Sequence, residues 1–209
     1  MNDMQRDNTA LPSDLNQSFR AFRPTIPALI PFPGEYEYTG WKDEQESWKT
    51  SCAIGDWSFL PKLRIEGPDA LKFLSDNMVN SFASFGVGRA KHAIQCNEDG
   101  KVIAEGVLLR RGDDSFEFQS GRPHYLAYLL DKGHYRAHCR WVTGFNFQIS
   151  GPNALALLEK LTTSTLRDIK FMHCKVITFD GALSPVRDCP VLAIRMGMSG
   201  EVGFELQGP

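Results

Sequence analysis

The stretch "LRIEGPDALKFLSDNM" at residues 63–78 decides the fold, because it recurs as "FQISGPNALALLEKLT" at residues 147–162. In both copies, alternating apolar residues predict a strand that ends at a Gly-Pro corner, and an Ala-Leu pair then begins a helix. Asp69 and Asn153 stand at the helix starts, where short polar side chains are favoured. The repeat predicts a duplicated module in which each helix packs on an antiparallel sheet.

The sequence around the two copies adds further strands. "HAIQCNEDGKVIAEGVLLRR" at residues 92–111 predicts a hairpin that turns on residues 97–100. "FEFQSGRPHYLAYLLDKG" at residues 116–133 predicts a strand, a break and a helix that closes at Gly133. "CPVLAIRMGMSGEVGFELQG" at residues 189–208 predicts two strands with a glycine-rich connection. Together they indicate an α+β fold of mainly antiparallel sheets with packed helices.

The first part of the chain has a different character. Residues 1–33 are polar and then rich in proline, which predicts an extended or disordered N-terminal arm. "WKDEQESWKTS" at residues 41–51 has the spacing of a short amphipathic helix. We expect residues 34–209 to form one region that contains two interleaved subdomains.

Composition excludes several classes of partner. The 209 residues are 42% hydrophobic with 14 Phe, which is enough for a globular core. The 23 basic and 25 acidic side chains are well mixed, so no basic stripe indicates a nucleic-acid partner. No apolar run approaches the roughly 18 residues of a membrane span, and the N-terminus lacks an export signal. We therefore expect a cytoplasmic protein with a small-molecule ligand, and the oligomeric state stays open.

Metal sites and activated nucleophiles find little support. The five cysteines are widely spaced and form no C-x-x-C pair. His134 and His138 could place two ligands on one helix face, but no third ligand is spaced nearby, so solvent-facing histidines are favoured. "GMSGE" has Glu201 where a nucleophile elbow needs glycine, which argues against Ser199. The sequence predicts no metal site.

The C-terminal stretch keeps one candidate site. In a strand, Glu201, Gly203 and Glu205 alternate to one face, so that a carboxylate could point into a cavity. The glycines would let a flat ligand approach the backbone. A solvated hairpin with ordinary surface glutamates explains the spacing equally well.

Four blocks of the sequence resemble one known superfamily. "MGMSGEVGFEL" resembles the G-Y-T-G-E-x-G-F-E-[IL] signature of the aminomethyltransferase (glycine-cleavage T-protein) superfamily, and "LRIEGPDALKFLSDNMVN", "CNEDGKVIAEGVLLR" and "FQISGPNALALLEKL" follow the same order over residues 41–209. "GWKDEQESWKTS", "LKFLSDNMVNS" and "GRAK" are most similar to its tetrahydrofolate-dependent vanillate and syringate O-demethylases. The resemblance implies a folate pocket at the centre of a three-domain ring, with the C-terminal domain missing here.

The resemblance also implies which residues bind tetrahydrofolate. Glu205 matches the glutamate that accepts hydrogen bonds from the pterin ring, and a carboxylate suits that edge because its two oxygens meet adjacent donors. Glu201 and Gly203 are placed beside it as further cofactor-binding residues. Family members often have Asp-Asp where this chain has Ala104-Glu105, which leaves Glu105 as the one carboxylate assigned to catalysis.

Three further residues are assigned to the substrate by resemblance. Arg122 could bind a benzoate carboxylate with its planar fork, although a surface arginine beside a helix start explains it equally well. Tyr36 is placed near the substrate, and Tyr38 could donate a proton to the departing phenolate oxygen. Both tyrosines could also be packing residues of the N-terminal arm.

The implied reaction is tetrahydrofolate-dependent O-demethylation of a methoxylated aromatic acid of the vanillate or syringate type. Catalysis would depend on holding the methyl group close to the folate nucleophile, without a reactive side chain. Without the C-terminal domain, we expect weak or no turnover. A glycine-cleavage aminomethyltransferase is the first alternative, and the loss of Asp-Asp counts against it. A non-catalytic folate-binding protein is the second, and the cysteines lack the setting expected of that class.

Overall fold

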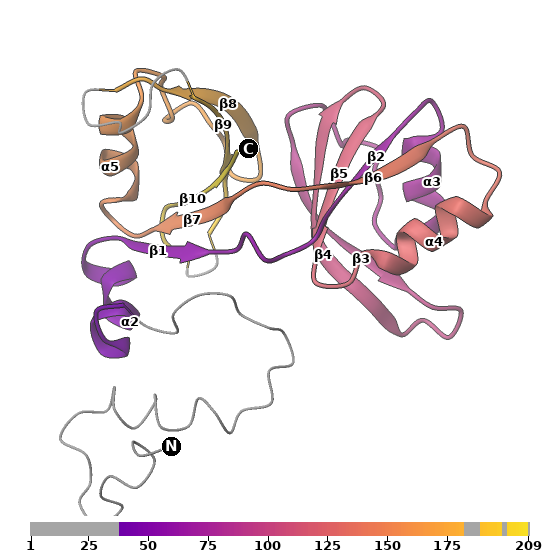
Figure 1. Cartoon of the computed structure of the whole chain (residues 1–209), viewed down its shortest axis with the longest axis horizontal. Helices are drawn as coiled ribbons and strands as arrows, with labels where there is room; N and C mark the ends of the chain where they lie inside the picture. The colour runs from indigo at the N-terminus through magenta and orange to yellow at the C-terminus, as the bar shows by residue number, and fades with distance from the viewer. Residues whose placement is uncertain (1–37, 182–188, 198–199, 209) are drawn as a thin grey trace, which may run out of the picture.

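The computed structural model describes residues 38–181, 189–197 and 200–208. Two five-stranded sheets form two lobes, with helices on their outer sides and the sheets facing each other (Figure 1). Every pair of neighbouring strands is antiparallel. The α+β fold with mainly antiparallel sheets is therefore confirmed.

Sheet B is the central part of the chain. Its strand order is β3-β4-β5-β2-β6, and the strands are β2 (Lys62–Glu66), β3 (Ala90–Cys96), β4 (Val102–Gly112), β5 (Ser115–Ser120) and β6 (His138–Val142). Helices α3 (Ala70–Asn77) and α4 (His124–Lys132) cover its outer face. Phe73, Leu74 and Leu126 of these helices are fully buried against Phe116 and Phe118 of β5. Burial of these large apolar side chains stabilises the lobe.

Sheet A combines the start and the end of the described chain. Its strand order is β1-β7-β10-β9-β8, and the strands are β1 (Ala53–Asp56), β7 (Asn146–Ser150), β8 (Cys174–Phe179), β9 (Cys189–Arg195) and β10 (Gly203–Gln207). Helix α5 (Ala154–Leu161) covers the outer face through Leu158, which packs with Phe204 and Leu206. Helix α2 (Trp41–Thr50) confirms the predicted amphipathic helix and lies next to β1.

The Gly-Pro corners explain why the module recurs. Gly67 and Gly151 have φ values of 133° and 128°, a conformation that only glycine adopts readily. A Cβ atom would lie 2.5 Å from the Arg136 carbonyl oxygen at Gly67, and 2.8 Å from the Ser51 carbonyl oxygen at Gly151. The duplicated strand, corner and helix are confirmed. The expected caps are not, since the Asp69 carboxylate accepts hydrogen bonds from Arg136 and makes none to its own helix.

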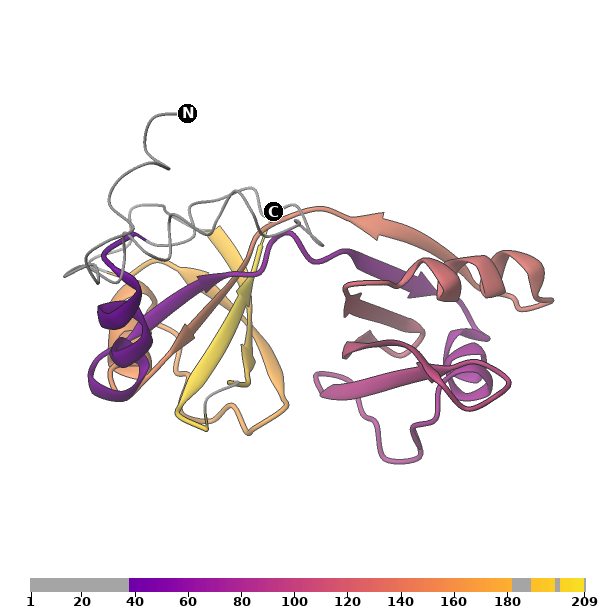
Figure 2. The same ribbon diagram turned by 90° about the horizontal axis from the view of Figure 1, so that it is seen from below.

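The chain crosses between the lobes twice, at residues 57–61 and 143–145, and the two crossings run side by side (Figure 2). The Trp57 backbone N–H donates to the Asn146 carbonyl oxygen at 2.8 Å, and the Asn146 N–H donates to Ser58 Oγ at 2.9 Å. Because of these crossings, β1 belongs to sheet A while β2 belongs to sheet B. These hydrogen bonds tie the first crossing to the start of β7.

The sheets also touch through their inner faces, and we call this contact the intersheet interface. Ala90 and Leu109 of sheet B pack with Leu192 and Ile194 of sheet A in a small apolar cluster. Beside this cluster, the facing side chains are mostly polar. The outer faces therefore supply the two main cores, and the inner faces are free to carry a site.

Candidate functional site

The inner face of sheet A carries a row of buried polar residues. Strands β7 and β10 pair so that Glu205 lies opposite Gln148, Gln207 opposite Asn146, and Gly203 opposite Ser150. Side chains alternate along a strand, so these six residues share one face while Phe204 and Leu206 face the outer core. The five members with side chains are all buried, namely Asn146, Gln148, Ser150, Glu205 and Gln207.

Glu205 is the buried carboxylate of this face. It is 6% exposed, and its Oε2 accepts a hydrogen bond of 3.1 Å from Asn146 Nδ2. Burial raises the pKa of Glu205, and the Asn146 hydrogen bond and the charge of Lys62 oppose that rise. The two carboxylate oxygens of Glu205 therefore lie in a low-dielectric environment, where a charge-assisted hydrogen bond from a ligand is strong.

Several polar atoms beside Glu205 have no partner among the described residues. Asn146 Oδ1, Gln148 Nε2 and Ser150 Oγ are buried without a hydrogen bond. The other end of the Gln148 amide is fixed, because its Oε1 accepts from the Trp57 indole N–H at 3.2 Å. Buried polar groups are nearly always paired in native proteins, so unused donors and acceptors in one row indicate a ligand or ordered water.

Sheet B contributes a buried cation and an amide to the same region. Lys62 is 4% exposed, and its Nζ donates to the Gly144 carbonyl oxygen at 3.2 Å. Burial lowers the pKa of Lys62, while the charges of Glu117, Glu205 and Asp56 raise it. Across the intersheet interface, Gln207 Nε2 donates to Gln119 Oε1 at 2.7 Å. The site is thus built from both lobes.

The structure changes the role expected for the C-terminal glycine and the first glutamate. Strand β10 begins at Gly203, so the prediction that Glu201 alternates with Glu205 in one strand is wrong, and Glu201 is exposed before the strand. A Cβ atom on Gly203 would lie 2.7 Å from both the Met196 carbonyl oxygen and Ser150 Oγ. The space above Gly203 is therefore filled by the protein itself, and Glu205 is the residue that faces the polar row.

Glu105 and Arg122 are brought together through Ser120. Ser120 Oγ donates to the Glu105 carbonyl oxygen at 2.6 Å and accepts from the Arg122 backbone N–H at 3.3 Å. Both side chains are exposed, and Glu105 Oε2 lies 3.9 Å from His92 Nε2. Ala104 faces the outer core, so Glu105 alone of this pair is on the inner side of β4. Their assigned roles stay predictions.

The structure does not bring Tyr38 to the polar row. Tyr38 is 74% exposed, and its backbone N–H donates to Glu44 Oε1 at 2.5 Å, next to the start of α2. Thr39 makes the same kind of hydrogen bond to Glu44 at 2.7 Å, so Glu44 fixes this turn. Tyr36 lies outside the described residues. Both substrate-side assignments remain predictions from the resemblance.

Comparison with known proteins places this arrangement in a family. Residues 23–209 match the family model of the GCVT N-terminal domain. The chain belongs to that family. The superfamily predicted from the sequence is therefore confirmed.

Relatives of this GCVT-domain chain have several activities. It is 31% identical over 176 residues to a sesamin methylene transferase from Sinomonas sp., which covers 82% of this chain and 37% of that protein. It is 31% identical over 199 residues to a syringate O-demethylase from Sphingobium sp., with 85% and 40% covered. The chain thus spans less than half the length of either relative.

The fold of the GCVT-domain chain is also similar to that of a protein with a crystal structure. The glycine cleavage system aminomethyltransferase T from Bartonella henselae matches with a TM-score of 0.67 and 20% identity, over 80% of this chain and 44% of that one. At this identity, the match shows the fold alone. It confirms the T-protein-like arrangement of the two sheets.

Sequence reasoning missed most of the polar row. Asn146 and Gln148 precede the Gly-Pro corner of the second module, where they alternate with apolar Phe147 and Ile149. That alternation predicts one polar face but does not show that the polar face is buried, because its cover comes from the other lobe. Lys62 and Gln119 were missed for the same reason.

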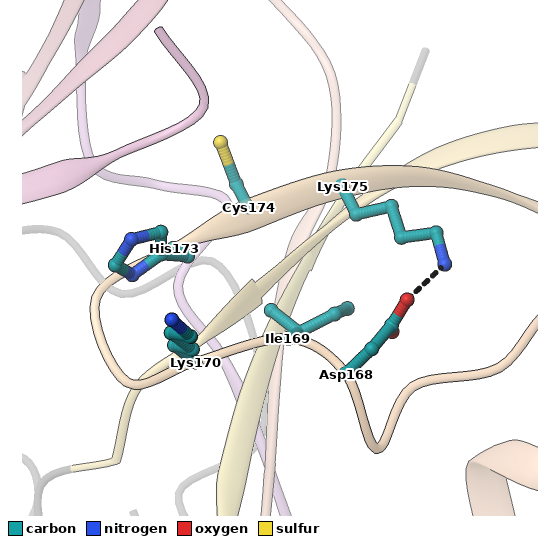
Figure 3. A pocket seen from close by; sticks show the side chains of 6 residues that line it. All are labelled: Asp168, Ile169, Lys170, His173, Cys174 and Lys175. Atoms are coloured by element: carbon teal, nitrogen blue, oxygen red, sulfur yellow. Dashed lines mark hydrogen bonds and ion pairs between the residues drawn. The ribbon is translucent and has the colours of Figure 1, made fainter. Parts of the chain in front are cut away.

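A hollow of about 320 Å³ lies apart from the polar row, beside β8 and the loop before it (Figure 3). Lys175 Nζ lies 2.9 Å from Asp168 Oδ2, so these two charges neutralise each other. Cys174 points away from this ion pair, and burial raises the pKa of its thiol. The hollow therefore lacks both an unpaired buried polar row and an activated thiol.

Two kinds of feature are absent from the described residues. Over residues 38–181, 189–197 and 200–208, no three His, Cys, Asp or Glu side chains gather as a metal site would require. His134 and His138 are exposed, as the sequence favours. In the same ranges, none of the helices has the length and apolar character needed to cross a bilayer.

Proposed function

We propose that this chain takes part in tetrahydrofolate-dependent methyl transfer, with a methoxylated aromatic acid of the vanillate or syringate type as the methyl donor. The observation that carries the proposal is the buried Glu205 carboxylate beside unpaired buried polar atoms of Asn146, Gln148 and Ser150. A syringate O-demethylase among the relatives supports the choice of donor.

The polar row fits a reduced pterin. A pterin ring has N–H donors and ring acceptors along one edge, so it needs acceptors and donors in a row. Glu205 would accept from the donors, and the unpaired Gln148 Nε2 would donate to an acceptor. Bound tetrahydrofolate supplies a nitrogen nucleophile that accepts the methyl group. The protein residues would then bind and orient the reactants and exclude water.

Glu105 and Tyr38 remain the proposed catalytic residues, and Arg122 and Tyr36 the proposed substrate-binding residues. Glu105 has the better position, since it lies on the inner side of β4 and its backbone is fixed by Ser120. Tyr38 would have to act from the turn before α2, where its ring is exposed. These assignments depend on the resemblance, and each can be tested by a single substitution to Phe or Gln.

Calorimetric titration of the chain with tetrahydrofolate tests the proposal. Glu205→Gln keeps the shape and removes the charge, so we expect affinity to fall about tenfold or more. Glu98→Gln, in the exposed 97–100 turn, is the matched control and should bind as the parent chain does. Equal affinity of the Glu205 variant and the parent would overturn the proposal.

Two further measurements divide the alternatives. If Glu201→Gln lowers the affinity for tetrahydrofolate as much as Glu205→Gln does, the prediction that both glutamates bind folate is upheld. Methyl transfer is then measured by mixing the folate-bound chain with vanillate or syringate and following the demethylated phenol. Aminomethyl transfer from a glycine-derived donor, in place of demethylation, would favour an aminomethyltransferase and contradict the proposed donor.

A further inference from the structure

A crevice of about 340 Å³ opens between the two lobes and continues from the polar row. Lys62 and Gln207 line the crevice and also belong to the surroundings of Glu205. Its volume lies at the lower end of the range for small-molecule sites, which are about 300–1,000 Å³. A ligand in the crevice would therefore lie beside the proposed folate site.

The two walls of the crevice differ in chemistry. Sheet A and the second crossing provide an apolar wall, which includes Val176, Leu192 and Phe145. Val176 is 61% exposed, although it lies on the inner face of β8 opposite Leu192. Sheet B provides a wall of basic side chains, from Lys62, Arg64 and Arg111. This pairing suits a molecule with an apolar body and an anionic group.

Two of the three basic side chains already have partners. Arg64 donates to Glu117 Oε2 from Nε at 3.1 Å and from Nη2 at 2.5 Å, and Glu117 is 2% exposed. Lys62 donates to the Gly144 carbonyl oxygen. Glu117 is the one acidic side chain among the residues that line the crevice, and Arg64 occupies it.

Arg111 is the basic side chain that remains. It is half-buried at the end of β4, and its guanidinium makes no hydrogen bond or ion pair with any residue of the described ranges. Its charge reaches Cys174 of β8, so it acts across the intersheet interface. A partly desolvated guanidinium without an acceptor, next to an apolar wall, favours an anion.

We propose that the crevice binds an aromatic acid through its carboxylate, with Arg111 as the residue that receives the carboxylate. The planar fork of Arg111 matches two carboxylate oxygens, and the apolar wall of Val176 and Leu192 covers the ring. The assignment adds a substrate-binding residue to the proposed function, and it rests on that function for the identity of the acid. It replaces the assignment of the carboxylate to Arg122, which is exposed at the break before α4.

Binding of vanillate to the chain without folate tests this assignment separately from the proposed function. By calorimetry, Arg111→Gln should weaken vanillate binding about tenfold or more, and Arg111→Lys should give a smaller loss because charge stays and the fork is lost. Arg167→Gln removes the same charge from an exposed ion pair with Glu159 and is the matched control. Its affinity should equal that of the parent chain.

Two readouts separate carboxylate binding from a structural role. The primary amide of vanillate has the same ring without the charge, so its weak binding should be unaffected by Arg111→Gln. Added salt should weaken vanillate binding to the parent chain and have little effect on the Arg111→Gln variant. The thermal midpoint of the Arg111→Gln variant should stay at or above that of the parent, since an unpaired cation has been removed.

Three outcomes would overturn the assignment. The first is that Arg122→Gln weakens vanillate binding while the Arg111→Gln variant binds vanillate normally. The second is an equal loss of vanillate and its amide in the Arg111→Gln variant. The third is that N-(4-aminobenzoyl)-glutamate, and not vanillate, depends on Arg111, which would make the crevice a site for the folate tail. Retained folate binding in any of these cases would leave the proposed function intact.

Discussion

The two copies of the module place different chemistry on the same backbone. In the first copy, the inner face of β2 carries Lys62, Arg64 and Glu66, and each is paired within the protein. Glu66 accepts from Ser115 Oγ at 2.9 Å and from Arg140 Nε at 3.3 Å. The first copy thus uses its polar atoms to hold sheet B together.

The second copy has neutral residues at the equivalent positions. The inner face of β7 carries Asn146, Gln148 and Ser150, and each of them has one buried polar atom without a described partner. Both strands end at the same kind of glycine corner, and both helices bury an equivalent outer face. The outer face and the corner therefore set the fold, while the inner face of the second copy is left available for a ligand.

The largest expected effect comes from making the same substitution at equivalent positions of the two copies. Arg64→Met leaves the carboxylate of Glu117 buried without its partner, so we expect the free energy of unfolding to fall by about 3 kcal/mol. Gln148→Met removes an amide whose Nε2 has no partner, so the free energy of unfolding should change by no more than about 1 kcal/mol. Urea denaturation followed by circular dichroism measures both. Equal losses of stability would show that the polar side chains of the two copies are paired to the same extent.

A smaller effect is expected at the corners, where the copies should behave alike. Gly67→Ala and Gly151→Ala each force a side chain into a left-handed conformation and against a backbone carbonyl, so each should cost about 2 kcal/mol or more. Gly100→Ala is the control, because its φ of 75° is also left-handed but a Cβ there meets nothing within 4 Å. Its cost should be nearer 1 kcal/mol. Tolerance at one corner alone would show that the copies differ in structure as well as in chemistry.

The features that could be predicted from the sequence are those set by nearby residues. The Gly-Pro corners, the 97–100 turn and the helix that closes at Gly133 depend on local backbone preferences, and all are present in the structure. Glu205 could be singled out as a site residue because it lies in a short motif. The fold of both lobes followed from these local signals and from the repeat.

The features that could not be predicted depend on the other lobe. Lys62 and Gln119 reach the site of Glu205 only because two crossings bring the sheets face to face. The prediction for Glu201 is wrong because it extends the alternating strand pattern two residues too far toward the N-terminus. Strand β10 begins only at Gly203, which packs tightly against Met196 and Ser150. A strand pattern shows which residues share a face, but the start of the strand is set by tertiary contacts.

The smallest expected effect is the pH dependence that Glu205 adds to the second copy. Burial raises the pKa of Glu205 in the folded chain above its value of about 4.3 in the unfolded chain, so folding favours the protonated form. The contribution of Glu205 to stability is therefore complete below about pH 4 and is lost as pH rises through the folded pKa. Glu205→Gln should remove this dependence.

The comparison is made by urea denaturation at pH values from about 4 to 8. The Glu205→Gln variant should gain in free energy of unfolding relative to the parent as the pH rises, while it loses affinity for tetrahydrofolate. The Glu98→Gln control should follow the parent at every pH, because Glu98 is exposed in both states. A Glu205 variant that instead loses stability toward neutral pH would show that Lys62 and Asn146 hold the carboxylate as an ion. Glu205 would then be stabilised as a charge within the protein, like the charged residues of the first copy, and only the unpaired atoms of Asn146, Gln148 and Ser150 would still distinguish the second copy.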